Sequence, residues 1–137
     1  MNPRQVAKYM FDQDYFSQWM NIKLIEVREN YCLIEMPIKK EMINGLKTVH
    51  GGVTFAFADS ALAFSSNNSG DAAVALNCII NFTKAGKEGD TFRAESILVN
   101  ETRKTAVYDI KITNQNEELI AKFVGTVYKI GKKVIEL

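Results

Sequence analysis

The sequence predicts an α+β fold in which an antiparallel sheet is wrapped around one long central helix. Three observations carry this prediction. Residues 53–66 are rich in Ala, Phe and Leu, which favours a helix that is apolar on nearly every face. Four segments after that helix alternate apolar and polar residues as strands do, and two more strands precede it. A helix without a polar face must be enclosed, and one curling sheet is the simplest enclosure.

The N-terminal part of the chain predicts short helices and then a strand pair. Asn2 and Pro3 are typical of a helix cap and first turn, so residues 3–19 are expected to form one or two short helices. Strands are expected over residues 22–28 and 31–38.

Turn residues and a proline indicate where the expected strands begin and end. Glu29-Asn30 is expected to form a hairpin turn between the first two strands. Pro37 has no amide hydrogen to donate, so the second strand should lie at an edge or a bulge at that point. Residues 40–50 are loop-like. The last four strands are expected over residues 73–83, 91–100, 105–113 and 118–130.

Length, charge and cysteine use narrow the class of protein. The 137 residues are expected to form a single domain over 1–137. A net charge of +1 argues against nucleic-acid binding and against a polybasic membrane surface. Cys32 and Cys78 lie in apolar runs and are expected to be buried free thiols, which fits the reducing cytoplasm. With His50 as the single histidine, no common structural zinc site is expected. Neither a signal segment nor a membrane span is expected.

Asp59 is the one carboxylate in the apolar stretch from Thr48 to Gly70, which also lacks Lys and Arg. A lone acid in such surroundings costs stability unless it is paired, hydrogen-bonded or protonated. Unpaired acids in apolar clefts are enriched at functional sites. An Asp bonded to its own helix, to Ser60 or to a neighbouring element would instead be structural. The residues alone leave both interpretations open.

The run Val49-His50-Gly51-Gly52 begins the same helix. The start of a helix leaves amide hydrogens unpaired and carries positive partial charge, and glycines let a substrate approach the backbone closely. Such a place suits a carbonyl oxygen that gains negative charge, as in an oxyanion hole. The simpler alternative is a tight turn that only starts the helix, with His50 satisfied by the backbone.

Spacing along the helix connects these two features. Gly51 and Asp59 are eight positions apart, which is about 12 Å along a helix. One Asp side chain cannot reach a carbonyl held at Gly51 of the same helix. Either the two features serve different purposes, or antiparallel helices from two subunits bring them together twice in a symmetric dimer.

The motif Asn44-Gly-Leu-Lys-Thr-Val-His50-Gly-Gly, followed by Phe57-Ala-Asp59-Ser-Ala-Leu-Ala-Phe64, resembles the hotdog-fold acyl-CoA thioesterases. The resemblance is strongest to the branch named for phenylacetic acid degradation and extends over roughly residues 40–130. It implies a hotdog fold and a homodimer with a continuous sheet and shared active sites, commonly paired into a homotetramer. It also implies hydrolysis of acyl-CoA thioesters without a metal or another cofactor.

The resemblance assigns roles to four residues. The family's Asp that matches Asp59 acts as general base on water or as nucleophile. The backbone amide that matches Gly51 polarises the thioester carbonyl. The residues that match His50 and Asn44 orient or contact the thioester, from the subunit opposite the Asp.

Substrate-binding candidates surround this set. Besides Gly52, where a substrate can approach the backbone, Lys84, Arg103 and Lys104 could contact the phosphates of coenzyme A, although each also fits a solvated turn. Some family members carry Ser or Thr in the first strand after the helix to position water, and this chain has Ala75 there. Water positioning would then fall to backbone groups or to Asn77.

Three rival functions remain open. A non-catalytic acyl-CoA-binding hotdog protein would need an output module, for which the chain leaves no room. A hotdog dehydratase uses a His with a carboxylate near the central helix, whereas His50 lies in the glycine motif. A purely structural oligomer would leave Asp59 without a role. The thioesterase interpretation is therefore preferred, with a small aryl- or acyl-CoA as substrate.

Overall fold

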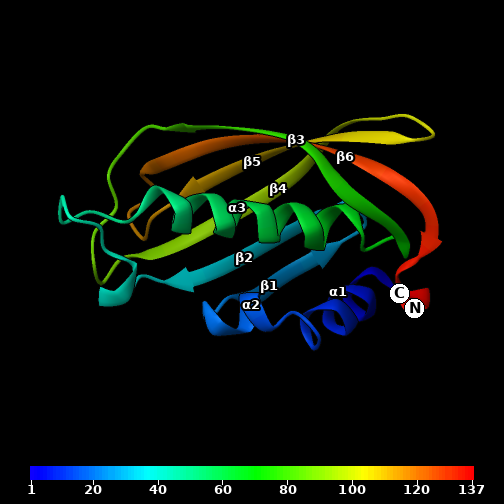
Figure 1. Ribbon diagram of the computed structural model, residues 1–137, viewed down its shortest axis with the longest axis horizontal. Coiled ribbons are helices and arrows are strands. Elements are labelled where there is room, and N and C mark those ends of the chain that lie inside the picture. Colours follow the sequence, from blue (N-terminus) through cyan, green and yellow to red (C-terminus); the bar gives the residue numbers. More distant parts are fainter.

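The computed structural model describes residues 1–137, and Figure 1 shows one curved sheet with a long helix lying across it. The sheet has six strands in the order β1-β2-β4-β5-β6-β3, and every neighbouring pair is antiparallel. The helices are α1 (Pro3–Phe11), α2 (Tyr15–Trp19) and α3 (Gly51–Ser66). The strands are β1 (Lys23–Arg28), β2 (Tyr31–Pro37), β3 (Asp71–Phe82), β4 (Thr91–Glu101), β5 (Thr105–Thr113) and β6 (Leu119–Lys133). The predicted α+β arrangement is confirmed.

Two short helices form at the N-terminus, as predicted, because each has a capping side chain. Asn2 Oδ1 accepts the amide hydrogen of Gln5 at 2.8 Å, and the Gln5 side chain accepts that of Asn2 in return. Asp14 caps α2 through the amide of Ser17. Both helices lie beside β1 in Figure 1.

The β1–β2 hairpin turns at Glu29-Asn30, as predicted, with Asn30 in the left-handed region at φ 58°. Pro37 is the last residue of β2 and pairs only with β4, because the pairing of β1 ends at Glu35. The strand therefore has an open side where proline removes the amide hydrogen, which confirms the expected local edge.

The core lies between α3 and the sheet. Most of the largest fully buried side chains come from α3 and from the sheet face that contacts it, and include Phe57, Phe64, Leu62, Phe92, Tyr108 and Phe123. Gly125 of β6 lets α3 approach the sheet closely, because a Cβ there would lie 2.7 Å from Leu62 Cδ2. One side of α3 stays open, and Gly52, Phe55 and Asp59 are exposed along it.

The strict alternation expected along β3 is wrong in its first half. An irregularity lies between Ala75 and Asn77. Val74 pairs with exposed Tyr128 and therefore lies on the outer face of the sheet. Cys78 and Phe82 face α3, because their partners on β6, Gly125 and Ala121, are buried.

The two cysteines differ in burial. Cys32 is a buried free thiol, whereas Cys78 is free but only partly buried, which corrects the expectation that both are buried. None of the helices combines the length and the apolar character needed to cross a bilayer.

Candidate active site

The start of α3 presents one unpaired backbone amide. His50 is the N-cap, and its Nδ1 accepts the amide hydrogen of Gly52 at 2.8 Å. The carbonyl of His50 accepts the amide hydrogens of Val53 at 3.0 Å and Thr54 at 3.3 Å. The amide hydrogen of Gly51 has no acceptor in the chain. It is therefore free to bind an external oxygen at the positive end of the helix.

A tight loop held by Asn44 leads into this helix start. Asn44 Oδ1 accepts the amide hydrogens of Leu46 at 2.9 Å and Thr48 at 3.2 Å, and the hydroxyl of Thr48 at 3.3 Å. The amide of His50 donates to Met42 O at 2.8 Å. Asn44 thus shapes the loop with its oxygen, and its Nδ2 hydrogens have no acceptor in the chain.

Asp59 lies on the open side of α3 without a polar partner. No hydrogen bond or ion pair in the chain reaches its carboxylate, so it is not bonded to its own helix or to Ser60. Although the residue is exposed in the single chain, desolvation by the surrounding groups raises the pKa of Asp59, and the Asp14 carboxylate raises it further. A carboxylate of this kind is more basic than an ordinary surface Asp.

Gly51 and Asp59 do not meet within the chain. Both lie on the continuous helix α3, at its first residue and its ninth, so they are separated by about 12 Å along the axis. The expected separation of the two features is confirmed, and one chain alone does not bring the base to the free amide.

A hollow of about 330 Å³ adjoins Gly51. Its lining includes Gly51, Thr54, Phe82, Lys84, Gly86 and Ile120. Lys84 therefore lies beside the helix start, where its ammonium pairs with Glu118 at 3.1 Å. Phe82 bounds the free amide, because a Cβ at Gly51 would lie 3.3 Å from Phe82 Cζ.

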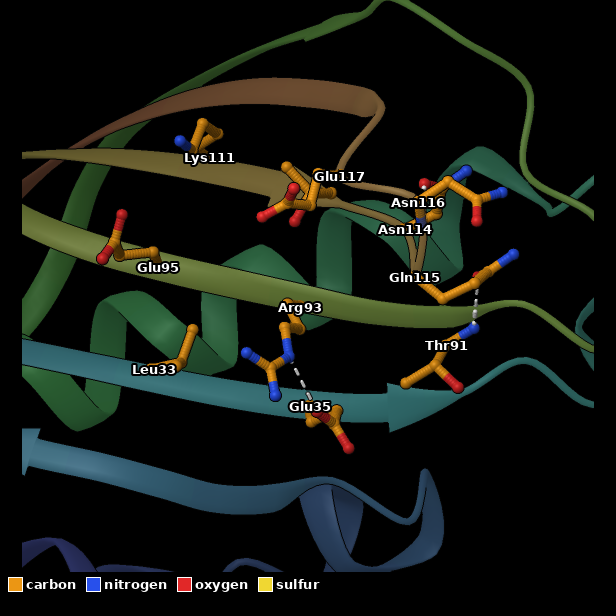
Figure 2. A pocket seen from close by; sticks show the side chains of 11 residues that line it. Leu33, Glu35, Thr91, Arg93, Glu95, Lys111, Asn114, Gln115, Asn116 and Glu117 are labelled. Atoms are coloured by element: carbon orange, nitrogen blue, oxygen red, sulfur yellow. Dashed lines mark hydrogen bonds and ion pairs between the residues drawn. The ribbon is translucent and has the colours of Figure 1, made fainter.

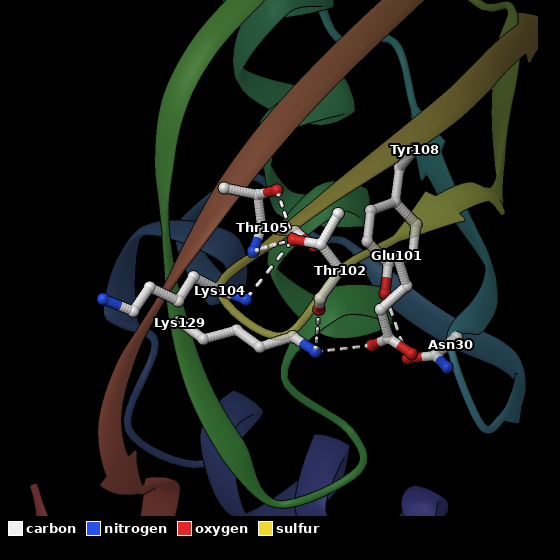
Figure 3. Close-up of polar contacts among 7 residues, drawn as sticks. All are labelled: Asn30, Glu101, Thr102, Lys104, Thr105, Tyr108 and Lys129. Atoms are coloured by element: carbon white, nitrogen blue, oxygen red, sulfur yellow. Dashed lines mark hydrogen bonds and ion pairs between the residues drawn. The ribbon is translucent and has the colours of Figure 1, made fainter.

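Arg103 and Lys104 lie far from this hollow. They occupy the turn between β4 and β5, at the opposite end of the sheet from the start of α3 in Figure 1. Figure 3 shows the ordered turn, in which Thr102 Oγ1 accepts the amide hydrogen of Lys104 at 3.3 Å and the Lys129 ammonium contacts Glu101 at 2.8 Å. The chain therefore does not bring the three predicted basic residues together.

Asn77, which was expected to position water, and Ala75, which replaces the Ser or Thr of some family members, lie on different faces of β3. Asn77 pairs with Thr126, whose neighbour Gly125 faces α3, so Asn77 lies on the outer face. Ala75 pairs with buried Val127 and faces α3. Asn77 is therefore not placed to orient water at Asp59 of its own chain.

A second hollow, larger than the one beside Gly51, is lined by neither Asp59 nor Gly51. It has a volume of about 730 Å³ and lies on the outer face of the sheet (Figure 2). Its lining is almost wholly polar, and Arg93 there already pairs with Glu35 at 2.8 Å. The open side of α3, with an unpaired base and an unpaired amide, is the better candidate for chemistry.

Sequence reasoning missed two groups that interact with Asp59. Asp14 reaches this region through the buried hydroxyls of Ser17 and Ser60, and the Asp59 carboxylate contributes to the raised pKa of Cys78, after the desolvation that is its main cause. These residues come from three elements far apart in sequence, so no local spacing pointed to them. The structure contains no cluster of three or more side chains suited to hold a metal ion.

Comparison with known proteins agrees with this fold. The model of the thioesterase superfamily matches residues 46–121. The acyl-coenzyme A thioesterase PaaI of Escherichia coli is 36% identical over 127 residues, which are 93% of this chain and 91% of that protein. The structure of E. coli PaaI, from the phenylacetic acid degradation operon, superposes with a TM-score of 0.94 at 35% identity, covering 96% of this chain and 95% of that one.

A second solved structure adds a ligand. The smu.793 protein of Streptococcus mutans, bound to acetyl CoA, superposes with a TM-score of 0.79 at 29% identity and covers 82% of this chain and 90% of that one. The fold is thus the hotdog fold of the thioesterases. The chain belongs to the thioesterase superfamily, and within it is similar to PaaI.

Proposed function

We propose that this protein is an acyl-CoA thioesterase that hydrolyses a small aryl- or acyl-CoA to the free acid and coenzyme A. One observation carries the proposal: α3 presents an unpaired carboxylate, Asp59, and an unpaired amide, Gly51, on a chain of the thioesterase superfamily. A base and an oxyanion site are the two groups that thioester hydrolysis needs. The acetyl CoA bound to the S. mutans relative supports coenzyme A as the carrier.

The active site we propose is shared between two copies of the chain. β3 is an edge strand with a free side, and its exposed side chains include Leu76 at 65% and Ile79 at 59% exposure. An exposed apolar edge is a template for pairing with another strand. Antiparallel pairing of two β3 strands about a twofold axis would continue the sheet and set the two α3 helices side by side. Asp59 of one chain would then lie near Gly51 of the other, twice.

The proposed reaction needs no leaving-group acid. The thioester oxygen accepts the Gly51 amide hydrogen and gains negative charge as the carbonyl is attacked. Asp59 either removes a proton from the attacking water or attacks the carbonyl itself to form an anhydride that water then hydrolyses. The C–S bond breaks, and coenzyme A leaves as a thiolate, which is stable enough to depart without prior protonation. Both versions require Asp59 to be ionised.

In the proposed site, neighbouring groups orient and bind the acyl-CoA substrate. His50 accepts a hydrogen bond at Nδ1, so its neutral ring carries the proton at Nε2 and presents it outward. Asn44 likewise has Nδ2 hydrogens to donate, and Gly52 keeps the helix start free of side-chain bulk. Lys84 beside the hollow, with Arg103 and Lys104 brought in from the partner chain, would meet the phosphates of coenzyme A.

The wider setting is also part of the proposal. Pairing of two dimers would give the homotetramer that the resemblance implies. A cytoplasmic location fits two cysteines that are both free thiols.

The test is thiol release from phenylacetyl-CoA, benzoyl-CoA and hexanoyl-CoA by the wild type and Asp59→Asn. Asn preserves the size of Asp but is neither base nor nucleophile. We expect turnover by the wild type and a decrease of about a hundredfold or more in the variant. Binding of these thioesters without turnover by the wild type would contradict the proposal and favour a non-catalytic acyl-CoA-binding protein.

A further inference from the structure

Asp14 lies in the link between α1 and α2 and makes two hydrogen bonds to one residue. Its Oδ1 accepts the amide hydrogen of Ser17 at 2.9 Å, which is an ordinary helix cap. Its Oδ2 accepts the hydroxyl of Ser17 at 2.6 Å, a short contact typical of a charged acceptor. The second bond is more than capping requires.

This hydroxyl continues the chain of hydrogen bonds to the central helix. Ser17 Oγ lies 2.9 Å from Ser60 Oγ, and the two residues are 0% and 7% exposed. An ionised carboxylate only accepts, so Ser17 donates to Asp14, and Ser60 must then donate to Ser17. The chain therefore runs from Ser60 to Ser17 to Asp14, and it ends on α3 at the residue next to Asp59.

Few charged groups act on Asp59 besides Asp14. After desolvation, the Asp14 carboxylate is the remaining cause of the raised pKa of Asp59. Cys78 of β3 also interacts with Asp59, but burial and the Asp59 charge both raise the pKa of its thiol, which keeps it neutral. No cation contributes to the pKa of Asp59, so the effect of Asp14 is not cancelled.

We propose that Asp14 is a positioning residue of the thioesterase reaction, which holds α2 against α3 beside Asp59 through Ser17 and Ser60 and sets a second carboxylate within electrostatic range of Asp59. This inference rests on the proposed role of Asp59. The like charge disfavours the ionised form of Asp59 and so makes it a stronger base, while the buried hydroxyl chain fixes the distance at which that charge acts.

The first test compares Asp14→Asn with Asp12→Asn. Asn caps a helix about as well as Asp, so α2 is retained while the charge is lost. Asp12 also loses a charge, but it pairs with Lys8 on the surface at 2.9 Å and does not act on Asp59. The measurement is the acid limb of kcat/KM for hexanoyl-CoA, which reports the pKa of the essential base in the free enzyme.

We expect the acid limb to move to lower pH in Asp14→Asn, because removal of a like charge favours the ionised form of Asp59. The plateau value of kcat should fall as the base weakens. Asp12→Asn should keep the wild-type profile. A limb that stays in place in Asp14→Asn, or that moves to higher pH, would overturn the inference.

Ser17→Ala tests the hydrogen-bond chain alone, because the charge of Asp14 is retained. It also provides a second test if Asp14→Asn folds poorly. It removes the link to Ser60 and leaves the carboxylate and its backbone cap in place. We expect kcat to fall by about three- to tenfold with KM little changed, since one buried hydrogen bond to α3 is lost. An unchanged kcat would overturn the positioning role. If Asp59→Asn retains full activity, the proposed function itself fails. If only the acid limb of the pH profile is unchanged in Asp14→Asn, the role of Asp14 fails and the proposed function stands.

Discussion

Nδ1 of His50 accepts the amide hydrogen of Gly52 at 2.8 Å, and this one bond determines which amide of the helix start stays free. With Gly52 paired to the imidazole and Val53 and Thr54 paired to the His50 carbonyl, Gly51 is left without an acceptor. The imidazole therefore acts as a helix cap whose geometry exposes the neighbouring amide. This relationship leads to the first two predictions.

Gly51→Pro should abolish most activity while the chain stays folded. Gly51 is the first residue of α3, where proline is well tolerated, and His50 has φ −60° and ψ 132°, which suit a residue before proline. The substitution removes the amide hydrogen, and loss of one oxyanion donor lowers kcat by about 100- to 1000-fold. Gly51→Ala is the matched control, because it adds the same Cβ near Phe82 and keeps the hydrogen. Equal activities of the two variants would contradict the role of the amide.

Gly52→Ala should lower activity by disturbing the His50 cap. A Cβ at this position would lie 3.0 Å from Nδ1 and 3.1 Å from Cε1 of His50, so the ring must shift. We expect a decrease of about tenfold or more in kcat/KM and a loss of about 0.5–2 kcal/mol in the free energy of unfolding, typical of a weakened N-cap. Gly45→Ala serves as control, since nothing lies within 4 Å of its Cβ. A Gly52→Ala protein that matches Gly45→Ala in both measurements would show that the cap is dispensable.

Asp59→Asn should raise stability near neutral pH while it removes activity. The pKa of Asp59 is raised on folding, so the folded state binds the proton more tightly than the unfolded state and the ionised form is penalised in the fold. Asn carries no such penalty. The difference in free energy of unfolding between the variant and the wild type should shrink as pH falls through the pKa of Asp59 in the folded state. It should vanish below the ordinary pKa of an Asp. Urea unfolding at several pH values measures it, and a variant less stable than the wild type at pH 7 would contradict the assigned cause.

Leu76→Glu should weaken self-association and activity together. Leu76 is 65% exposed on the edge strand β3, and a charge there opposes strand pairing between chains. We expect a smaller particle by light scattering, a large loss of kcat and a retained circular dichroism spectrum. Ile135→Glu, at a residue 58% exposed near the C-terminus, should change neither size nor activity. A Leu76→Glu monomer with full activity would show that one chain carries a complete site.

The elements of the fold were predictable because their signals are local. The apolar run after Gly51 predicted the central helix, Asn2 and Pro3 predicted the first one, and alternation predicted the strands. The boundaries agree within two residues, except that β6 continues three residues further than predicted, to Lys133. The isolation of Asp59 in an apolar stretch was also visible from sequence, and the structure adds that no side chain of the chain pairs with it.

Features that depend on tertiary contact were not predictable in the same way. The irregularity between Ala75 and Asn77 shifts the register of β3, so the apparent alternation placed Val74 and Ala75 on the wrong faces. The contact between Ser17 and Ser60 joins residues 43 positions apart, and no local pattern marks it. The sequence around Lys84 and Arg103 did not indicate that these two residues lie at opposite ends of the sheet.

The most direct test of a site shared between two chains is subunit complementation. Chains carrying Asp59→Asn and chains carrying Gly51→Pro are co-expressed with different tags, and the mixed dimer is purified through both tags. If Asp59 of one chain works with Gly51 of the other, the mixed dimer contains one intact site and should show about half of the wild-type activity per dimer. Activity no higher than that of the two mutant homodimers would place the base and the amide of each site in the same chain and contradict the account.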